Sequence, residues 1–418
     1  MGTTVQKLQA ILDSKSDIKD AIEAKGVTVG DAPFDEYASK ISEISGGGSE
    51  EAYENDVNFY DYDGRRIASY TIDEAKALTQ AEYDVILPPA HEGLTFQEWN
   101  WSLSDITSYD RQYIDVGANY VTTDGKTRIY LHAEDNEEFS FKVTISNATL
   151  YVDWGDDNSA TGTGRITLSH TYTTKGHYVV TFYSNLPEGR TFTLNVLDDT
   201  KISCVHMVDE IRVGKDVYVG NNYVFRYYTC KISISTTSLT SVNAGCFTNA
   251  IMPIVVVPKT CTSLSANVGF AAHCGIVSLP KSMTTLGATS YFFTYNSPKL
   301  ILPEVTDVSW AAPANYFNNS SFIEIVSLPL SFKWDTSVIG NFNAMGNLYY
   351  VDIVQGWTPN VNLNISSSTK WTAANMAKFF NKLGTTSTAI TLTFGSTNLN
   401  KLTAEQKAIA TNKGYTLA

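Results

Sequence analysis

An irregular repeat between about Val213 and Ile365 restricts the possible folds of this chain more than any other feature of its sequence. Its phenylalanines recur at steps of 22 to 25 residues, at Phe225, Phe247, Phe270, Phe293, Phe317 and Phe342. About ten to twelve residues after each comes a short apolar run, and four runs stop at a proline: Pro258, Pro280, Pro303 and Pro329. A period of this size indicates units that stack on their neighbours because none can bury its own apolar face.

The apolar runs alternate in polarity. The position directly before the stop holds Ile234, Val257, Leu279, Leu302, Leu328 and Ile353, and the position two residues earlier holds Ile232, Val255, Val277, Leu300, Val326 and Val351. The position between them holds Ser233, Val256, Ser278, Ile301, Ser327 and Asp352. This alternation predicts one short strand per repeat, with one face buried and the other mostly exposed to solvent.

The rest of each unit follows a Leu-Thr-Ser-Val pattern, at residues 239–242 and less completely at 263–264, 285–286 and 305–308. Together with the motif Phe-x-Asn/His-x-x-x-Ile-x-Leu-Pro, it resembles the BspA-like class of leucine-rich repeats, found in surface proteins and in phage tail proteins. The resemblance covers about 150 residues. It implies a solenoid, in which we expect each phenylalanine to plug the interior opposite the strand and each proline to end the strand pairing.

The composition narrows the class of protein. The 418 residues carry a formal net charge of −13 and a pI near 4.9, which argues against a nucleic-acid partner. Aromatic residues make up 12% and charged residues only 17%, a balance typical of β-rich extracellular or virion proteins. No apolar run approaches the ~18 residues of a membrane span, so we expect no membrane insertion. The N-terminus lacks the apolar segment of a secretory signal, so we expect no export by that route.

Five cysteines fall in or beside the repeats: Cys204, Cys230, Cys246, Cys261 and Cys274. Their number is odd and no two are spaced as Cys-x-x-Cys. Buried free thiols are therefore favoured over disulfides or a metal site. This predicts a chain that folds in a reducing cytoplasm.

The first 45 residues predict two helices. Apolar residues keep a rough three-four spacing across residues 4–25, and Asp-Ala-Pro at 31–33 begins a second helix with Phe34, Tyr37, Ile41 and Ile44 on one stripe. A helical pair this small needs a partner for its stripe, either the next domain or other copies of the same segment. We favour homo-oligomerisation through residues 1–45, with a trimer as the favoured oligomer. The segment resembles N-terminal modules of tail proteins from gut phages and prophages, and a Gly-rich linker follows at residues 46–52.

Residues 53–130 predict a small α+β module. Residues 57–60 and 65–70 flank a hairpin turn, residues 73–82 form a helix, and Asp124-Gly125 turns a second hairpin into residues 127–132. Trp99 and Trp101 could stack on a sugar, but a core role is favoured. Residues 125–127 do not end a phosphate loop, because Tyr120 stands where that loop needs glycine. This stretch resembles a module of phage tail and baseplate-type proteins.

Residues 131–198 predict a β-sandwich, because five alternating segments are separated by turn signals. Asp153-Trp154-Gly155-Asp156, followed by His170-Thr171-Tyr172 and Gly176-x-Tyr178-x-Val180, resembles the PKD (polycystic-kidney-disease) family of immunoglobulin-like domains. The resemblance implies that Trp154 packs in the core; Asp157 departs from it, since glycine commonly stands there. Asp153, Asp156 and Asp157 are candidate Ca²⁺ ligands, but a turn that caps its own amides is favoured.

Residues 371–418 predict a cap for the exposed apolar end of the repeats. A helix is expected at 372–383, a strand at 390–394, a helix at 403–413 and a short strand near the end. The helix at 403 begins with Thr403-x-Glu405-Gln406, a capping pattern. The ending resembles the closing segment of BspA-like proteins.

No catalytic constellation stands out in the sequence. The six histidines are scattered, and no zinc-protease spacing, nucleophile elbow or dinucleotide fingerprint occurs. Paired carboxylates for glycoside cleavage need only meet in space, so a polysaccharide-degrading tail enzyme is a third hypothesis. We expect no enzyme activity, no cofactor, no catalytic residue and no metal ligand.

What the sequence predicts instead is binding. Exposed aromatic rings among Asn and Ser suit contacts with a sugar or a protein. The candidate ligand-binding residues are Trp310, Tyr316, Trp334 and Tyr349, together with Ser278, Ser327 and Asp352 from the polar face of the strands. The last three are expected to line one exposed surface.

The sequence therefore predicts a multidomain, β-rich α+β protein. Its parts are the helical segment, the α+β module, the PKD-like sandwich and, at residues 199–370, a leucine-rich-repeat solenoid with an α/β cap. The favoured function is a virion component, of tail-fibre, baseplate or receptor-binding type, that contacts other virion proteins and binds a host-surface glycan or protein through the repeats. The alternative is a BspA-like adhesin on the bacterial cell surface, and the missing signal favours the virion.

Overall fold

The computed structural model describes residues 56–195, 202–220, 224–242, 246–247, 250–264, 274–283, 285–286, 297–302, 322–334, 340–342 and 345–418, and single positions at 15, 16, 18, 19, 29, 30 and 33. The chain divides into two compact units, Met1–Asn55 and Asp56–Ala418. In the first unit, Lys19 Nζ donates a hydrogen bond to the Gly30 carbonyl at 2.7 Å. The helical stripe, the linker and the oligomer interface predicted within residues 1–52 otherwise lie outside the described residues.

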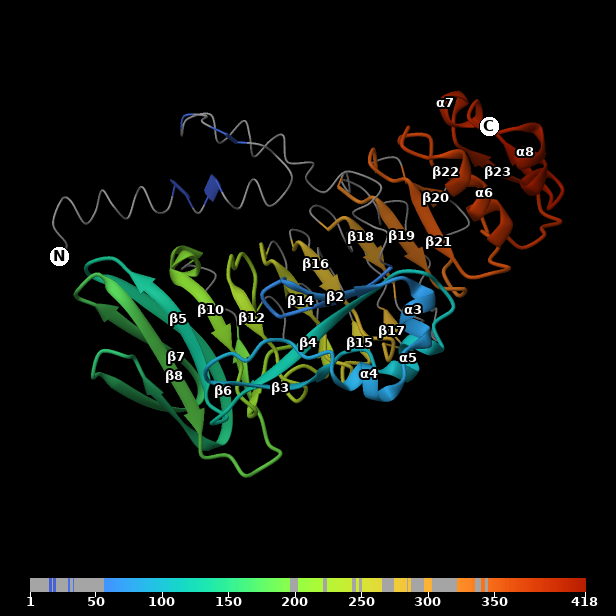
Figure 1. Cartoon of the computed structure of the whole chain (residues 1–418). Coiled ribbons are helices and arrows are strands. Elements are labelled where there is room, and N and C mark those ends of the chain that lie inside the picture. Colours follow the sequence, from blue (N-terminus) through green and yellow to red (C-terminus); the bar gives the residue numbers. More distant parts are fainter. Residues whose placement is uncertain are drawn as a thin grey trace. The chain divides into compact units, whose positions relative to one another are not determined.

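The second unit is β-rich, has few helices and contains six sheets within the described residues, which confirms the β-rich class (Figure 1). No helix in the described part of the chain is long and apolar enough to cross a membrane.

The first sheet has the strand order β2-β1-β4-β3. Its strands are β1 (Val57–Tyr60), β2 (Arg66–Tyr70), β3 (Leu94–Trp99) and β4 (Ile114–Thr122). The predicted first hairpin is confirmed, since β1 pairs antiparallel with β2. Three helices accompany the sheet: α3 (Ile72–Ala77), α4 (Gln80–Asp84) and α5 (Leu103–Thr107). The single helix predicted at 73–82 is wrong, because Thr79 forms a capping box with Glu82 and starts a new helix.

The second predicted hairpin is also wrong. Gly125 does turn the chain, with its N–H donating to the Thr122 carbonyl at 3.0 Å. However, β5 (Thr127–Ala133) leaves the first sheet and pairs antiparallel with β8 and β10 instead of β4. The turn therefore joins two sheets, a partner choice that local turn chemistry does not fix.

The second sheet has eight strands, in the order β11-β9-β6-β8-β5-β10-β12, with β7 beside β6. Its further strands are β6 (Glu137–Asp153), β7 (Ser159–Tyr172), β8 (Gly176–Ser184), β9 (Phe192–Asn195), β10 (Val208–Arg212), β11 (Val217–Tyr218) and β12 (Lys231–Ser233), and a 3-10 helix spans Ile202–Met207. Strand β10 pairs antiparallel with β5 and parallel with β12. The series of repeat strands thus begins on the edge of this sheet.

The repeat strands pair in parallel. One row consists of two sheets, of which the first contains β14 (Ile254–Val256) and β16 (Ile276–Ser278). The second contains β18 (Lys299–Ile301), β19 (Ile325–Leu328) and β21 (Tyr350–Ile353), and β18 contacts β16 without pairing with it in the described residues. A second row contains β13 (Ser241–Val242), β15 (Ser263–Leu264) and β17 (Thr285–Leu286), and a later sheet joins β20 (Gly340–Asn341), β22 (Leu363–Asn364), β23 (Ile390–Thr393) and β24 (Tyr415–Leu417). Equivalent residues are partners: Val255 faces Val277, and Val326 faces Val351. The strand predicted before the stop of each repeat is confirmed for these units, but the second row shows that the expectation of a single strand per repeat is wrong.

The predicted exposed face of these strands is wrong. The intervening residues Ser233, Val256, Ser278, Ile301, Ser327 and Asp352 are all buried. Strand β4 contacts β12, β14 and β16, so the first sheet lies over this side of the repeats. At these positions the strands are therefore buried on both faces.

The terminal segment agrees with its prediction. It contains α6 (Ala373–Lys382), β23, α7 (Ser396–Leu399), α8 (Ala404–Thr411) and β24. Thr403 and Gln406 form the capping box that starts α8. Trp371, Phe379 and Phe394 pack edge to face, with centroids 5.1 to 6.2 Å apart, and give this segment its own apolar core.

Candidate functional site

The predicted aromatic ligand-binding residues do not form a surface within the described part of the chain. Trp310 and Tyr316 lie outside the described residues. Trp334 is 2% exposed and packs against Phe332 at 4.6 Å, with Phe342 and Trp357 beside it. Its prediction as a surface residue is wrong, because these rings enclose it. Tyr349 is half-buried.

The predicted polar surface is also wrong. Ser278, Ser327 and Asp352 are each 0% exposed. We call the contact that covers them the seam: residues 100–119 of the first sheet and its loops on one side, and the repeat strands on the other.

Asn100 is fully buried in the seam. Its Nδ2 donates to the carbonyls of Val257 at 3.0 Å and Ser278 at 3.1 Å, and its Oδ1 accepts from the Gly117 N–H at 2.7 Å. The Ser278 hydroxyl donates to the Asp115 carbonyl at 2.5 Å. A buried carbonyl left without a donor costs free energy, so a fully buried amide at position 100 matches the backbone groups it meets.

Asp115 also forms a buried ion pair. Its Oδ1 lies 2.8 Å from Lys299 Nζ, and the two side chains are 6% and 4% exposed. Such a pair gains little over two well-packed apolar residues, but removing one partner leaves an uncompensated buried charge. Loss of either partner is therefore expected to cost more than the intact pair contributes to stability.

Arg111 carries the next contact. Its guanidinium is buried, and Nη1 donates to the Leu302 carbonyl at 2.7 Å and to the Ser327 hydroxyl at 3.1 Å. The guanidinium carbon lies 4.7 Å from the centroid of the Tyr109 ring, and Nε lies 3.6 Å from an Asp110 carboxylate oxygen. Arg111 thus joins two consecutive repeats through one planar group.

Asp352 ends the seam. Its Oδ2 accepts from the backbone N–H of Gln112 at 2.6 Å, and the N–H of Tyr113 lies 3.4 Å away. Its Oδ1 pairs with Lys382 Nζ from α6 at 2.7 Å. One carboxylate therefore links residues 100–119, here called the covering unit, with the last strand of the row and with the terminal segment.

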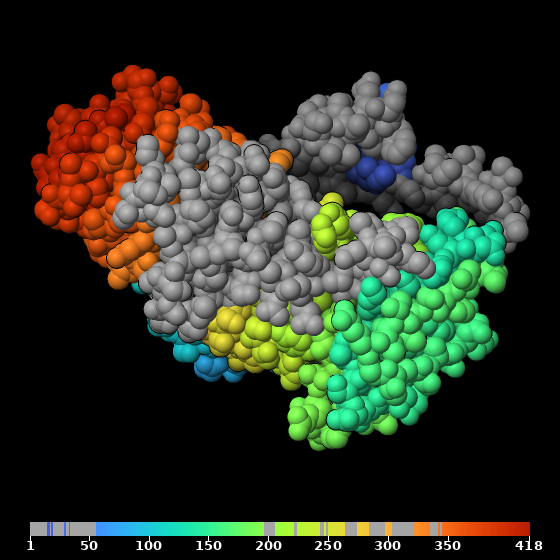
Figure 2. Space-filling view, turned by 180° about the vertical axis from the view of Figure 1, so that it is seen from behind, coloured from blue at the N-terminus to red at the C-terminus, as the bar shows by residue number. Residues whose placement is uncertain are grey.

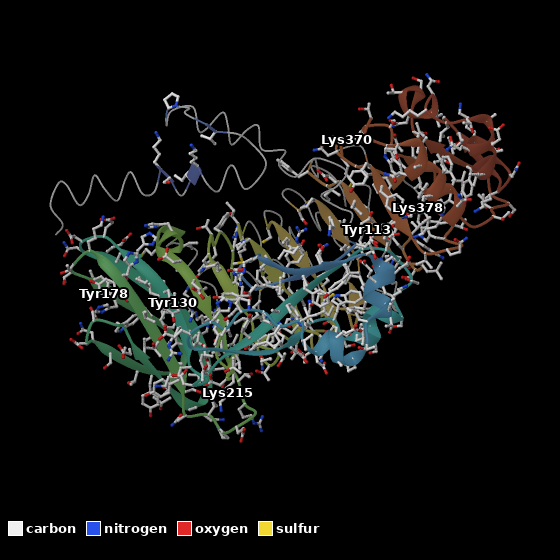
Figure 3. The ribbon with its side chains drawn as sticks, in the orientation of Figure 1. Tyr113, Tyr130, Tyr178, Lys215, Lys370 and Lys378 are labelled. Atoms are coloured by element: carbon white, nitrogen blue, oxygen red, sulfur yellow. The ribbon has the colours of Figure 1, made fainter. Side chains whose placement is uncertain are left out.

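The margin of the seam beside Asp352 carries further titratable groups. Gln112 Nε2 donates to Asp56 at 2.5 Å, and Lys378 Nζ donates to Gln112 Oε1. Lys378 lies close to Tyr113 (Figure 3), and its Nζ is 5.1 Å from the centroid of the Tyr350 ring. Burial raises the pKa of Asp56, and burial together with the nearby Lys382 lowers the pKa of Lys378. Both shifts reflect the poor solvation of charge at this junction.

The seam joins two parts of one chain and leaves its polar groups inaccessible to a ligand. Sequence reasoning missed it because the covering residues lie well over a hundred positions away from most of their partners. The only sequence signal was the row of Ser and Asp residues on a strand face, and that row is equally compatible with water or with a polar partner.

A close approach in the seam predicts a measurable coupling. A Cβ added at Gly117 would lie 2.6 Å from both methyl groups of Val256. Gly117→Ala is therefore expected to lower the free energy of unfolding by about 1–3 kcal/mol through overpacking. The double variant with Val256→Ala should recover a substantial part of that loss. Chemical denaturation of the two single variants and the double variant measures the coupling, and additive effects would contradict the contact.

Three histidines that are distant in sequence meet on the eight-stranded sheet. His132 and His177 are direct partners on β5 and β8, with centroids 6.4 Å apart, and His206 lies 6.5 Å from His132. Asp209 lies 2.9 Å from His132 Nδ1. The cluster depends on strand pairing, which spacing in the sequence does not reveal. Within the described residues, no group of three or more His, Cys, Asp or Glu side chains is arranged to hold a metal ion.

The acidic turn at residues 153–157 caps its own amides. Asp153 Oδ1 accepts from the Gly155 N–H at 2.9 Å, and Asp156 Oδ1 accepts from the Asn158 N–H at 3.3 Å. The other oxygen of Asp156 lies 2.6 Å from His170 Nε2. The predicted capping of the turn's own amides is confirmed.

Four cysteines are buried free thiols, as predicted: Cys230, Cys246, Cys261 and Cys274. Burial raises the pKa of Cys261 and Cys274 to about 12, and raises that of the other two as well. Since the thiolate is the reactive form, we expect at most one of the five thiols of the chain to react with a thiol reagent in the native protein at pH 8. All five should react in guanidinium chloride. Titration with Ellman's reagent tests this, and two or more fast native equivalents would contradict it.

The fold and the seam together define a β-rich protein in which one segment of the chain covers a row of short parallel strands. Comparison with protein-family models, with curated proteins and with solved structures finds no match to this chain. The resemblances to BspA-like repeats and to PKD domains therefore depend on the sequence motifs that carry them.

Proposed function

We propose that residues 199–370 form a BspA-like leucine-rich-repeat solenoid. The parallel pairings support this, because they join residues 21 to 26 positions apart, such as Glu210 with Lys231 and Lys299 with Ile325. These offsets match the period of the phenylalanines. Stacked units that contribute strands to these rows would give a rod whose neighbours bury each other's apolar faces.

We also propose that residues 131–198 form a PKD-like sandwich. Strand β6 changes register between Ile145 and Leu150, so that β9 pairs with its first half and β8 with its second. A bent strand shared in this way is one route to two layers. Trp154 is 2% exposed, as the family motif implies. It also stacks on His170 at 5.2 Å, and the Tyr172 hydroxyl donates to its carbonyl.

We infer that the protein is a virion component, of tail-fibre, baseplate or receptor-binding type, that attaches the particle to a host-surface glycan or protein and has no enzyme activity. The observation that carries this proposal is the seam: three parts of the chain are locked into one scaffold by buried polar contacts. A rigid scaffold of repeated units presents many surface positions to an extended partner, which suits recognition rather than chemistry. The other partners would be virion proteins.

The buried seam changes where the ligand would bind. Ser278, Ser327 and Asp352 are inaccessible, so the strand face cannot serve. We infer that binding uses the sides of the repeat units that the first sheet leaves uncovered. Tyr349 is the one candidate aromatic residue in the described part of the chain that keeps partial exposure.

Immunogold labelling tests the virion proposal against the adhesin alternative. Antibodies raised against the purified chain should label tails of particles released from the source bacterium. Labelling of the cell envelope, with unlabelled particles, would favour the adhesin.

A pull-down with purified surface polysaccharide tests binding and enzyme activity together. The chain should retain the polysaccharide without shortening it. Shortening, measured by size-exclusion chromatography of the polysaccharide, would favour the tail enzyme.

The proposed trimer is tested by light scattering. The full chain should contain a multiple of three copies, and a chain that begins at Tyr53 should have fewer subunits. Equal subunit counts would rule out oligomerisation through residues 1–45.

A further inference from the structure

Strand β7 forms an open edge of the eight-stranded sheet. It is 14 residues long and pairs with β6 alone within the described residues. The eight-stranded sheet that contains it is the green part of the space-filling view (Figure 2). The backbone groups on its outer side are therefore available to another strand.

The margin of the sheet is apolar on its core side. Phe141 and Val143 of β6 are 1% and 0% exposed, whereas their partners on β7, Leu168 and Ile166, are only half-buried. The apolar layer thus ends at β7, because β7 is the last described strand on this side of the sheet. A strand added beside β7 would cover both side chains and extend the layer.

This edge lacks the devices that protect other edges of the unit. Strand β3 has a register shift between Phe96 and Glu98 and is tied down by the Gln97 hydrogen bond to Thr236, while β24 has three residues. On β7, Gly164 interrupts the strand with a φ of +75°, but the eight residues from Arg165 to Tyr172 follow without a proline or a lysine. Long edges of this kind are templates for pairing.

We propose that β7 pairs antiparallel with β7 of a second copy of this chain, around a two-fold axis at Leu168. In this register Leu168 faces itself, Thr167 faces Ser169, Ile166 faces His170 and Arg165 faces Thr171. The two half-buried apolar side chains fall at or next to the axis, and the only permanent charge of the run, Arg165, meets a neutral residue. An antiparallel pair of identical strands is self-complementary and closes at two copies. The pairing does not depend on the proposed function.

The test substitutes the residue at the axis. Leu168→Lys would place two like charges directly opposite each other in the pair, which opposes pairing, while a lysine at an open edge keeps its ammonium in water. If residues 1–55 hold three copies together, light scattering of the full chain should give six copies for the wild type and three for Leu168→Lys. If they hold no copies together, it should give two copies for the wild type and one for Leu168→Lys. Thr161→Lys, an exposed position before Gly164 on the same strand, should keep the wild-type mass. Equal masses for the wild type and Leu168→Lys over a wide dilution series would overturn the proposal.

Hydrogen exchange provides a test without a substitution, in case Leu168→Lys fails to fold. The amides of residues 165–172 that point away from β6 should exchange more slowly at high than at low wild-type concentration. Exchange independent of concentration would overturn the pairing. The same result with slow exchange throughout would mean that another segment of the same chain covers the edge.

Discussion

Replacement of Asp352 by alanine is expected to lower the free energy of unfolding by about 3–5 kcal/mol, the cost of leaving a buried ion pair without one partner. The carboxylate is 0% exposed, accepts from the backbone of Gln112, and pairs with Lys382 at 2.7 Å. Without it, the amide of Gln112 stays buried with no acceptor and Lys382 loses its counter-charge. Guanidinium denaturation followed by circular dichroism measures the loss.

Two further substitutions make this result specific to the seam. Asp352→Asn keeps the shape and one acceptor, so it should cost less than alanine. Glu134→Ala removes an exposed pair, since Glu134 and Lys175 are 64% and 66% exposed, and should change stability by less than about 1 kcal/mol. If Asp352→Ala were no worse than Glu134→Ala, Asp352 would not be buried beneath the covering unit.

Trp101→Ala is expected to lower the free energy of unfolding by about 3–5 kcal/mol as well, through loss of a large buried side chain and the cavity it leaves. The indole is 1% exposed, packs edge to face with Tyr109 at 5.1 Å, and donates from Nε1 to the Leu279 carbonyl at 2.8 Å. This single residue thus buries an aromatic surface against a repeat 178 positions away in the sequence.

The matched variants separate the ring from its hydrogen bond. Trp101→Phe keeps most of the buried surface and leaves the Leu279 carbonyl without that donor, so a loss of about 1–3 kcal/mol is expected. Val85→Ala, at a side chain that is 75% exposed, should stay within about 0.5 kcal/mol of the wild type. A loss for Trp101→Ala no larger than that for Val85→Ala would show that the indole does not anchor the seam.

Sequence reasoning succeeded where a local pattern decides the structure. The apolar alternation around Val326 and Val351 located the repeat strands, and the capping pattern at Thr403 located the start of α8. The motif around Trp154 identified a buried indole, and the odd cysteine count favoured free thiols. In each case, the residues that determine the outcome are close together in the chain or share one period.

Most of the wrong predictions concern which parts of the chain contact each other, and one is local. The helix predicted at 73–82 failed on a local point, since Thr79 is a better helix start than a helix interior. The others are long-range: β5 joined a different sheet from β4, and the face that carries Ser278 and Asp352 was taken as exposed. A serine on a strand face satisfies its hydroxyl equally with water or with a neighbouring carbonyl, so its type alone cannot distinguish the two.

The candidate site also shows the difference between local patterns, which the sequence reveals, and long-range contacts, which it does not. Aromatic residues were chosen for their abundance, but Trp334 is enclosed by three other rings and contributes to packing. The residues that link the parts of the unit, such as Asn100 and Arg111, have no motif around them. Their roles depend on carbonyl groups of distant strands, and those positions exist only once the chain has folded.

The sequence by itself determined the repeat, the strand before each stop and the β-rich class, because the spacing of apolar residues along the chain predicts which side chains are buried. Only the tertiary structure decided that residues 100–119 cover the repeat strands and that Ser278, Ser327 and Asp352 are buried. The physical reason is that a polar strand face can be satisfied by solvent or by another part of the chain, and that choice depends on the shape and hydrogen-bonding groups of a partner far away in sequence.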